Sequence, residues 1–150
     1  MTAIYAVGDE VEVDIGAVAH GGSCVARADG VVIFVRGSLP GERVRARITG
    51  APDHGRFARA DTLEVLVASP DRVVPPCPYA GTCGGCDWQH ARLVAQRKFK
   101  ADVVREQLTR LGGEPSGRWA ELDVEAVPGD DNGLGWRTRV HFAVDSQGNA

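Results

Sequence analysis

Lysine is nearly absent from this sequence, and long apolar runs are absent altogether. Lys98 and Lys100 are the only lysines. No apolar stretch approaches the roughly 20 residues that a membrane-spanning helix needs. The first residues also lack a basic stretch followed by an apolar one, so the sequence predicts no secretion signal. We therefore expect a cytoplasmic protein without membrane contact, and we expect it to be a monomer.

The overall charge is slightly acidic. A net charge of -3 disfavours a general nucleic-acid binder. Nearly all basic residues are arginine, which suits bidentate phosphate contacts and stacking on bases better than lysine does. A GC-rich genome that favours arginine codons explains the same bias equally well. The hydrophobic content of 43% and the charged content of 25% indicate a folded globular chain rather than a disordered one.

Residues 1–69 show the pattern of an all-β domain. In residues 10–19, apolar residues alternate with polar ones or glycine, which predicts a strand with one buried face. Asp29-Gly30 separates two strand-like runs and suits a type I′ hairpin turn, in which both positions have positive φ. With the runs at 42–49 and 57–67, the sequence offers five short strands, which predict a small closed barrel of the OB type. The alternating apolar positions of the first run are Val11, Val13, Ile15 and Ala17.

One predicted strand, residues 42–49, carries a row of arginines. Its apolar residues Val44, Ala46 and Ile48 share one face, so the arginines between them share the other. Alternate residues on a strand lie about 6.6 to 6.8 Å apart, close to the spacing of phosphates along one nucleic-acid strand. An ordinary solvated strand face is the competing interpretation, because aromatic residues for base stacking are scarce here. The candidate RNA-contacting residues are Arg43, Arg45, Arg47, Arg56 and Arg59.

The four cysteines fall into one isolated residue and one cluster. Cys24 lies alone within a predicted strand, which is typical of a small buried apolar side chain. A proline-rich linker begins near Ser69 and ends the β pattern. Residues 70–90 form this linker and a loop that holds Cys77, Cys83 and Cys86.

The clustered cysteines predict a metal site. Gly84 and Gly85 let the chain curl between two of the cysteines, and their backbone N–H groups can hydrogen-bond to sulfur. With His90, the cluster provides the four ligands of a Cys3His zinc site. An iron–sulfur cluster instead needs four thiolates, and Cys24 is the only other cysteine in the chain. Both kinds of centre stay open on the residues alone.

The segment after the cluster, residues 91–150, predicts a helix and the beginning of an α+β region. The helix is expected over residues 90–111, ending at Gly112-Gly113. Basic residues fall mostly outside its apolar face, and "LDVEAV" and "WRTRVHFAV" are expected to be strands. No glycine-rich strand-to-helix motif of the kind that binds a nucleotide cofactor is present. The predicted apolar stripe of the helix consists of Val94, Ala101, Val104, Leu108 and Leu111.

Four stretches together resemble a known enzyme family. They are "AHGGSCVARADGVVIFVRGSLPGERV", "CPYAGTCGGCDWQH", the basic helix after it, and "WRTRVHF". They resemble the N-terminal part of the S-adenosylmethionine-dependent RNA uracil-C5 methyltransferases that carry a TRAM domain. The cysteine stretch with its trailing "WQH" is the most specific of the four.

The resemblance implies that this chain is the RNA-binding part of a longer protein whose catalytic groups lie elsewhere. Residues 1–69 would be a TRAM domain, an OB-like RNA-binding module, and Cys77, Cys83 and Cys86 would be three ligands of a 4Fe-4S cluster. The fourth ligand is expected beyond Ala150, as are the S-adenosylmethionine site and the catalytic groups. The implied reaction is methylation of C5 of a uridine in rRNA or tRNA. The alternatives are a stand-alone RNA-binding module with a Cys3His zinc site and an iron–sulfur electron carrier.

Overall fold

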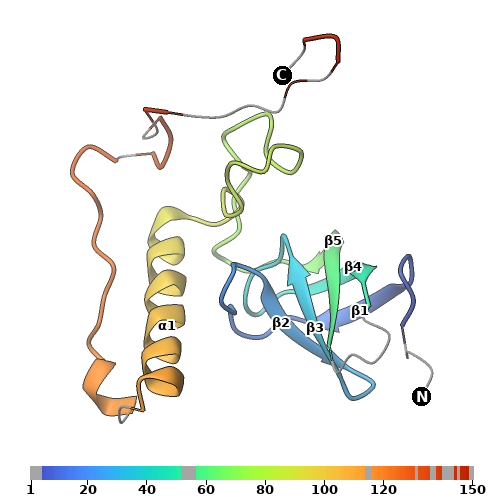
Figure 1. Cartoon of the computed structure of the whole chain (residues 1–150), viewed down its shortest axis with the longest axis horizontal. Coiled ribbons are helices and arrows are strands. Elements are labelled where there is room, and N and C mark those ends of the chain that lie inside the picture. Colours follow the sequence, from blue (N-terminus) through green and yellow to red (C-terminus); the bar gives the residue numbers. More distant parts are fainter. Residues whose placement is uncertain are drawn as a thin grey trace.

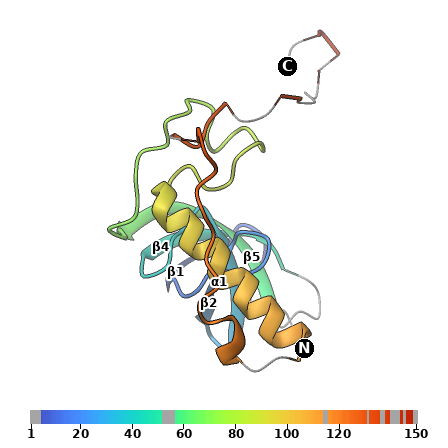
Figure 2. The same cartoon turned by 90° about the vertical axis from the view of Figure 1, so that its left-hand side faces the viewer.

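Residues 5–51, 57–113, 116–130, 132–135, 138–139, 144 and 146–148 are described in the computed structural model. Five strands form one curled sheet, a loop follows it, and a single long helix lies beside the barrel (Figure 1). Figure 2 shows the helix α1 crossing in front of the barrel when the molecule is turned by 90°. Within the described residues, no helix is both long enough and apolar enough to cross a membrane.

The barrel has the strand connections of an OB fold. β3 pairs with β5 in parallel, whereas the other pairs are antiparallel, and the order along the sheet is β1-β4-β5-β3-β2. The chain after β1 closes the sheet, because the Gly16 N–H donates to the carbonyl of Val25 at 2.8 Å and the Val25 N–H donates to Ala17 at 2.9 Å. The predicted OB-like barrel is confirmed. The strands are β1 Glu10–Asp14, β2 Cys24–Ala28, β3 Val31–Arg36, β4 Arg43–Gly50 and β5 Phe57–Val67.

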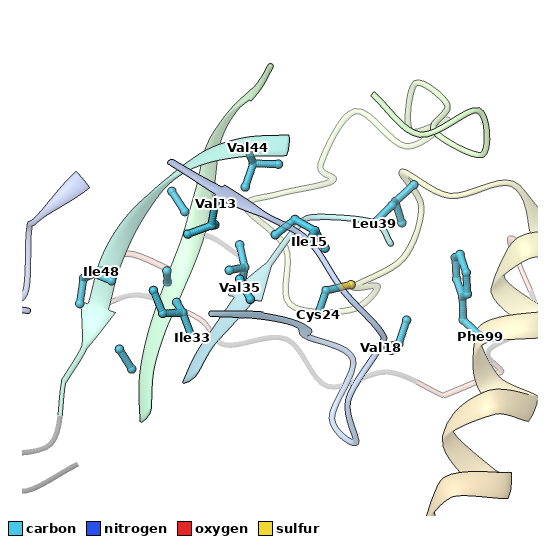
Figure 3. Packing of buried hydrophobic residues seen from close by; sticks show 14 of the residues in the cluster. Val13, Ile15, Val18, Cys24, Ile33, Val35, Leu39, Val44, Ile48 and Phe99 are labelled. Carbon is cyan, nitrogen blue, oxygen red and sulfur yellow. The ribbon is translucent and has the colours of Figure 1, made fainter. Parts of the chain in front are cut away.

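Alternation along the strands separates the core from the surface. Val44, Ala46 and Ile48 are at most 1% exposed, and the arginines between them face solvent, as predicted. Burying an aliphatic side chain of this kind contributes about 1.5–3 kcal/mol to folding. Cys24 lies in the same apolar cluster (Figure 3), and burial raises the pKa of its thiol to about 11. The expectation that Cys24 is a buried apolar side chain is confirmed.

The turn between β2 and β3 is confirmed, but the first predicted strand is too long. Asp29 and Gly30 have φ values of 50° and 78°, as a type I′ turn requires. β1 ends at Asp14, and the chain then bends to pair with β2. This bend shifts the alternation, so Val18 is buried whereas Ala17, predicted to face the core, is exposed.

A buried ion pair fixes the chain as it leaves the barrel. The Glu42 carboxylate is 1% exposed and accepts hydrogen bonds from Arg72 at 2.5 and 2.7 Å. It also accepts the backbone N–H groups of Leu39 at 2.8 Å and Ser69 at 3.2 Å. Arg72 donates in addition to the carbonyl of Gly37 at 2.8 Å. The first residues of the linker are therefore held on the barrel.

The helix α1 spans Leu93–Leu111 and begins three residues later than predicted. The backbone of the preceding residues bonds to the linker instead: the Val73 N–H donates to His90 at 2.9 Å, and the Arg92 N–H donates to Asp71 at 3.0 Å. The helix ends before Gly112-Gly113, as predicted.

The predicted apolar stripe of α1 is wrong in part. Ala101 is buried as predicted, but Val94 is 71% exposed and Leu111 81% exposed. The other buried residues of the helix, Ala95 and Phe99, lie outside the predicted stripe, and Phe99 lies at the margin of the barrel's apolar cluster (Figure 3). Ala95 and Phe99 also lie at helical spacing, so the periodicity of the sequence did not distinguish them from the predicted stripe. Phe99 is buried by Trp88, whose ring centroid lies 5.3 Å from that of Phe99.

No strand occurs among the described residues that follow α1. A 3-10 helix, η1 Ser116–Trp119, precedes an extended segment that runs beside α1 (Figure 1). Arg105 of α1 donates to the carbonyl of Leu122 at 2.5 Å, which ties the two together. The strand predicted for "LDVEAV" is therefore wrong, because its backbone pairs with no strand in the part of the chain that the structure describes. Most of "WRTRVHFAV" lies outside the described residues.

Candidate nucleic-acid interface and cysteine loop

The outer surface of β1 and β4 carries a ladder of ion pairs. The antiparallel register places Glu10 opposite Arg47, and their side chains lie 2.9 Å apart. This hydrogen bond from Arg47 holds the pKa of Glu10 below its usual value. From the other side, Glu64 of β5 lies 2.5 Å from Arg45. The whole set, which we call the charge ladder, pairs Arg43 with Glu12, Arg45 with Glu10 and Glu64, and Arg47 with Glu10.

The charge ladder changes what its arginines can offer to RNA. The predicted exposure of Arg43, Arg45 and Arg47 is confirmed, with side chains about half exposed. Each guanidinium already has a carboxylate partner, so its positive charge is partly compensated before any phosphate approaches. The RNA-binding role of this row remains a prediction.

A second part of the outer surface, on β2, β3 and the start of β5, has a different character. The rings of Phe34 and Phe57 pack edge to face with centroids 5.8 Å apart, and the Arg59 guanidinium lies 5.5 Å from the Phe57 centroid. Arg27 and Arg59 have no ion-pair partner among the residues that the structure describes. We call this surface the aromatic face; it consists of Val25, Arg27, Val32, Phe34, Phe57 and Arg59.

The aromatic face depends on a pairing that the sequence does not reveal. Parallel pairing of β3 with β5 places Phe34 beside Arg59 and Val32 beside Phe57. The only sequence signal was the alternation of Phe34 with the buried Ile33 and Val35. Of the predicted RNA-contacting residues, Arg59 lies on this face and Arg56 lies outside the described residues.

The three clustered cysteines lie on a loop built from turns, residues 75–90, which we call the cysteine loop. The Ala80 N–H donates to the carbonyl of Cys77 at 3.1 Å, and the Cys83 N–H donates to Tyr79 at 2.9 Å. The Cys83 sulfur accepts the Gly85 N–H at 3.4 Å, as expected for a glycine beside a thiolate ligand. Cys83 and Cys86 are exposed and all three are free thiols.

The donor types of the cysteine loop fit a thiolate-bound centre, but the donors lie too far apart in this structure to share one metal ion. Three thiols on one glycine-containing loop, with an N–H directed at sulfur, match the chemistry of zinc–thiolate and iron–sulfur sites. Within the described residues, no three His, Cys, Asp or Glu side chains lie close enough together to hold a metal ion. Binding would therefore require the loop to draw its sulfurs together.

His90 is turned partly toward the barrel. Its Nε2 lies 3.4 Å from the carbonyl of Ser38, so this nitrogen carries the proton when the bond is made. Burial holds the pKa of His90 below its usual value. The imidazole also lines a hollow of about 580 Å³ between barrel and loop, together with Cys83 and Cys86. Only Nδ1 would be free to bind a metal.

The cysteine loop is anchored to the barrel by several contacts. Asp87 pairs with Arg36 of β3 at 3.2 Å. The Trp88 indole packs against Gly22, where an added Cβ would lie 2.8 Å from its Nε1. Gly22 also has a φ of +86°, so any side chain there would be strained as well as crowded. The loop is thus held in register with the barrel.

Comparison with known families identifies the barrel. The TRAM domain family matches residues 6–63, which contain β1 to β4 and most of β5. A solution structure of a conserved protein from Methanococcus maripaludis is 32% identical over 39% of this chain and 81% of its own length, with a TM-score of 0.36.

Curated relatives extend the similarity through the cysteine loop and α1. An "Uncharacterized RNA methyltransferase" of Streptomyces avermitilis is 53% identical over 96% of this chain and 35% of its own length. The "23S rRNA (uracil(1939)-C(5))-methyltransferase RlmD" of Halomonas elongata is 45% identical over 91% of this chain and 27% of its own. The chain spans about a third of the length of the curated relatives it matches. With a TRAM domain in residues 6–63 and this similarity along nearly its whole length, the chain belongs to the TRAM-domain family of proteins named RNA methyltransferases.

Proposed function

We propose that this chain is the RNA-recognition and cysteine-loop part of an S-adenosylmethionine-dependent RNA (uracil-5-)-methyltransferase. The substrate would be a uridine in rRNA or tRNA, methylated at C5. The observation that carries the proposal is the aromatic face on a TRAM barrel, in a chain whose relatives are named RNA methyltransferases. The uracil-C5 specificity is supported by the relative from Halomonas elongata.

The aromatic face suits single-stranded RNA. Bases splayed out from a single strand stack on aromatic rings, and arginine adds stacking and phosphate contacts. Phe57 is 37% exposed and Phe34 is half-buried beside it, so a base has room to stack. Arg27 and Arg59 flank the rings without ion pairs among the described residues. OB folds bind oligonucleotides on the corresponding strands.

The chemistry of methyl transfer is assigned to regions that the longer relatives have in addition. S-adenosylmethionine would supply the methyl group there. Cys24 is buried with its pKa raised to about 11, so it does not suit a catalytic nucleophile. Residues of this chain would bind the RNA and orient it.

We infer that Cys77, Cys83 and Cys86 hold a 4Fe-4S cluster, with a fourth ligand from a region of the longer proteins. Three exposed or partly exposed thiols and the Gly85 N–H bond to sulfur support this assignment. The Cys3His zinc site is the second candidate, because His90 lines the same hollow as Cys83 and Cys86. The bond from its Nε2 to the Ser38 carbonyl leaves Nδ1 for the metal, which is the usual arrangement of a metal-bound histidine.

A chimera tests the function. Residues 1–150 would replace the matching N-terminal segment of the Halomonas elongata relative, and methylation of 23S rRNA would be measured in cells that lack the enzyme. We expect methylation to be restored. The chimera with Phe34→Ala and Phe57→Ala should be folded but strongly impaired. Full methylation by that variant would argue against recognition through the aromatic face.

Metal analysis tests the centre. The chain would be purified without oxygen and assayed for iron, acid-labile sulfide and zinc. With three local thiols, it should bind iron and sulfide weakly and lose them in air, and Cys83→Ser should bind less. Zinc at one ion per chain, lost in His90→Ala and retained in His20→Ala, would establish the Cys3His site instead.

A further inference from the structure

The first half of α1 concentrates positive charge without neutralising it. Between Asp87 and Asp102 the sequence contains four lysines or arginines and no acidic residue. Among the described residues, only Arg92 of this set has an ion-pair partner, Asp71 at 2.5 Å. The three cations without such a partner, which we call the α1 basic surface, are Arg97, Lys98 and Lys100.

The second half of the same helix shows the ordinary pattern. Arg105 pairs with Asp102 at 2.6 Å, and Arg110 pairs with Glu106 at 3.0 Å, at helical spacings of three and four residues. Arginine near the helix C-terminus is also favoured by the helix dipole. The cations of the second half of α1 are therefore paired with acidic residues of the same helix, whereas among the described residues those of the first half are not.

The charge order of α1 is the reverse of what helix stability favours. Acidic residues are preferred near a helix N-terminus, whereas α1 has none in its first turn and begins after Arg92, which makes no side-chain cap. Functional sites are where a sequence is expected to depart from what local stability favours, as this helix does by placing cations and no acidic residue in its first half. The α1 basic surface thus points to an external anion.

Two of the three cations line a concave surface. Arg97 and Lys100, three residues apart on one side of the helix, border a hollow of about 730 Å³. Its other walls are the cysteine loop, including Trp88, and the extended segment after η1, including Val124 and Val127. The volume falls within the range of small-ligand sites and can hold a nucleotide.

The acidic residues around this hollow do not neutralise the two cations. Asp87 is paired with Arg36 on the barrel. Glu125 and Asp130 belong to the opposite wall and have no ion pair with α1 among the described residues. Their presence disfavours a free multivalent anion and favours a ligand with spaced single charges, such as a polynucleotide strand.

We propose that the α1 basic surface binds backbone phosphates of single-stranded RNA and supplies more of the electrostatic affinity than the charge ladder does. This inference rests on the proposed RNA-recognition function. The charge of the ladder arginines is already partly compensated by carboxylates, whereas Arg97, Lys98 and Lys100 have no ion-pair partner among the described residues. The aromatic face would then stack bases while α1 holds the strand's backbone.

The experiment compares two triple variants with the same change in charge. A fluorescent single-stranded RNA 12-mer without secondary structure is titrated with the 150-residue chain at several potassium chloride concentrations. One variant carries Arg97→Gln, Lys98→Gln and Lys100→Gln. The matched control carries Arg43→Gln, Arg45→Gln and Arg47→Gln, and circular dichroism and thermal melting confirm that both are folded.

Each phosphate contact contributes about 0.7 to the slope of log affinity against log salt for a single strand, so the α1 variant should lower the slope by about 1.4 for the two cations at the hollow and by about 2 if Lys98 also contacts a phosphate. The ladder variant should lower it by less than about 0.7, the value of one contact. An unchanged slope in the α1 variant, with a parent chain that binds RNA, would overturn the inference and leave the proposed function standing. A parent chain that binds no RNA at any salt concentration would overturn both.

Discussion

The two parts of the barrel's outer surface carry the same residue type, arginine, in opposite settings. On β4, three alternate residues are arginines, and each one pairs with a glutamate of a neighbouring strand. On β2 and β5, Arg27 and Arg59 stand without ion pairs among the described residues, beside exposed or half-exposed phenylalanines. The richer arginine row is therefore the poorer candidate for RNA.

This difference shows that the partner of a charge decides its role. An exposed ion pair contributes only about 0–1 kcal/mol to stability, but it still neutralises its arginine toward a ligand. The Glu42–Arg72 pair shows the other extreme, because it is buried and holds the linker in place. The same two residue types thus serve as a surface ladder in one place and as a structural tie in the other.

The largest effect should come from breaking the buried pair. Glu42→Gln leaves Arg72 without its charge partner, and we expect the free energy of unfolding to fall by about 3 kcal/mol. The matched ladder variant Glu12→Gln should change it by less than about 1 kcal/mol. Urea denaturation followed by circular dichroism measures both. Equal losses would mean that burial does not distinguish the two kinds of pair.

The buried Glu42–Arg72 pair should also make the stability of the protein depend on pH. Burial alone would raise the pKa of Glu42, but hydrogen bonds from Arg72 and from the backbone at Ser69 and Leu39 outweigh it and hold the pKa below the ordinary value of 4.5. A lowered folded pKa stabilises the protein above the unfolded pKa, and this stabilisation is lost as pH falls through the folded pKa. Thermal melting from pH 7 down to pH 3 should therefore show a loss below about pH 4.5 that is smaller in Glu42→Gln. A parallel decline in both proteins would assign the acid sensitivity to other carboxylates.

Removing the rings of the aromatic face should weaken RNA binding next most strongly. Stacking contributes about 1–3 kcal/mol per base, so Phe57→Ala should lower affinity about tenfold. Phe57→Leu keeps an apolar side chain without a flat ring and should lower affinity nearly as much if stacking is the cause. Titration of a single-stranded RNA at fixed salt measures both variants. Full affinity in Phe57→Leu would indicate apolar contact rather than stacking.

The last expected effect is a gain of RNA binding on release of the ladder arginines. Glu10→Gln, Glu12→Gln and Glu64→Gln together remove their carboxylate partners. If the ladder is silent only because it is neutralised, the salt slope of RNA binding should rise by up to about 2. An unchanged slope, with affinity unchanged at low salt, would mean that this part of the barrel does not meet RNA at all.

The sequence predicted those features that depend on neighbouring residues. The alternation of Val44, Ala46 and Ile48 with arginine determined the two faces of β4, and Asp29-Gly30 determined a turn. Both are local consequences of strand geometry and of backbone freedom.

Features that depend on distant partners could not be predicted in this way. Phe34 and Phe57 are brought together only by the parallel pairing of β3 with β5, and Glu42 meets Arg72 across 30 residues of sequence. The apolar stripe of α1 was predicted wrongly in part for the same reason. Phe99 is buried because it packs against Trp88 from outside the helix, and the periodicity of the helix does not reveal that contact. The neutralisation of the arginine row likewise required the register of β1 against β4.

The tie between Glu42 and Arg72 has a consequence for domain transplantation. A barrel grafted onto another protein with its last residue at Ser69 would keep the buried carboxylate but lose the guanidinium that compensates it. A graft extended to Arg72 would also retain the donor that closes onto Gly37. The smallest segment that should fold after transplantation is therefore the barrel with its linker up to Arg72. This end lies three residues beyond Ser69, where the β pattern of the sequence stops.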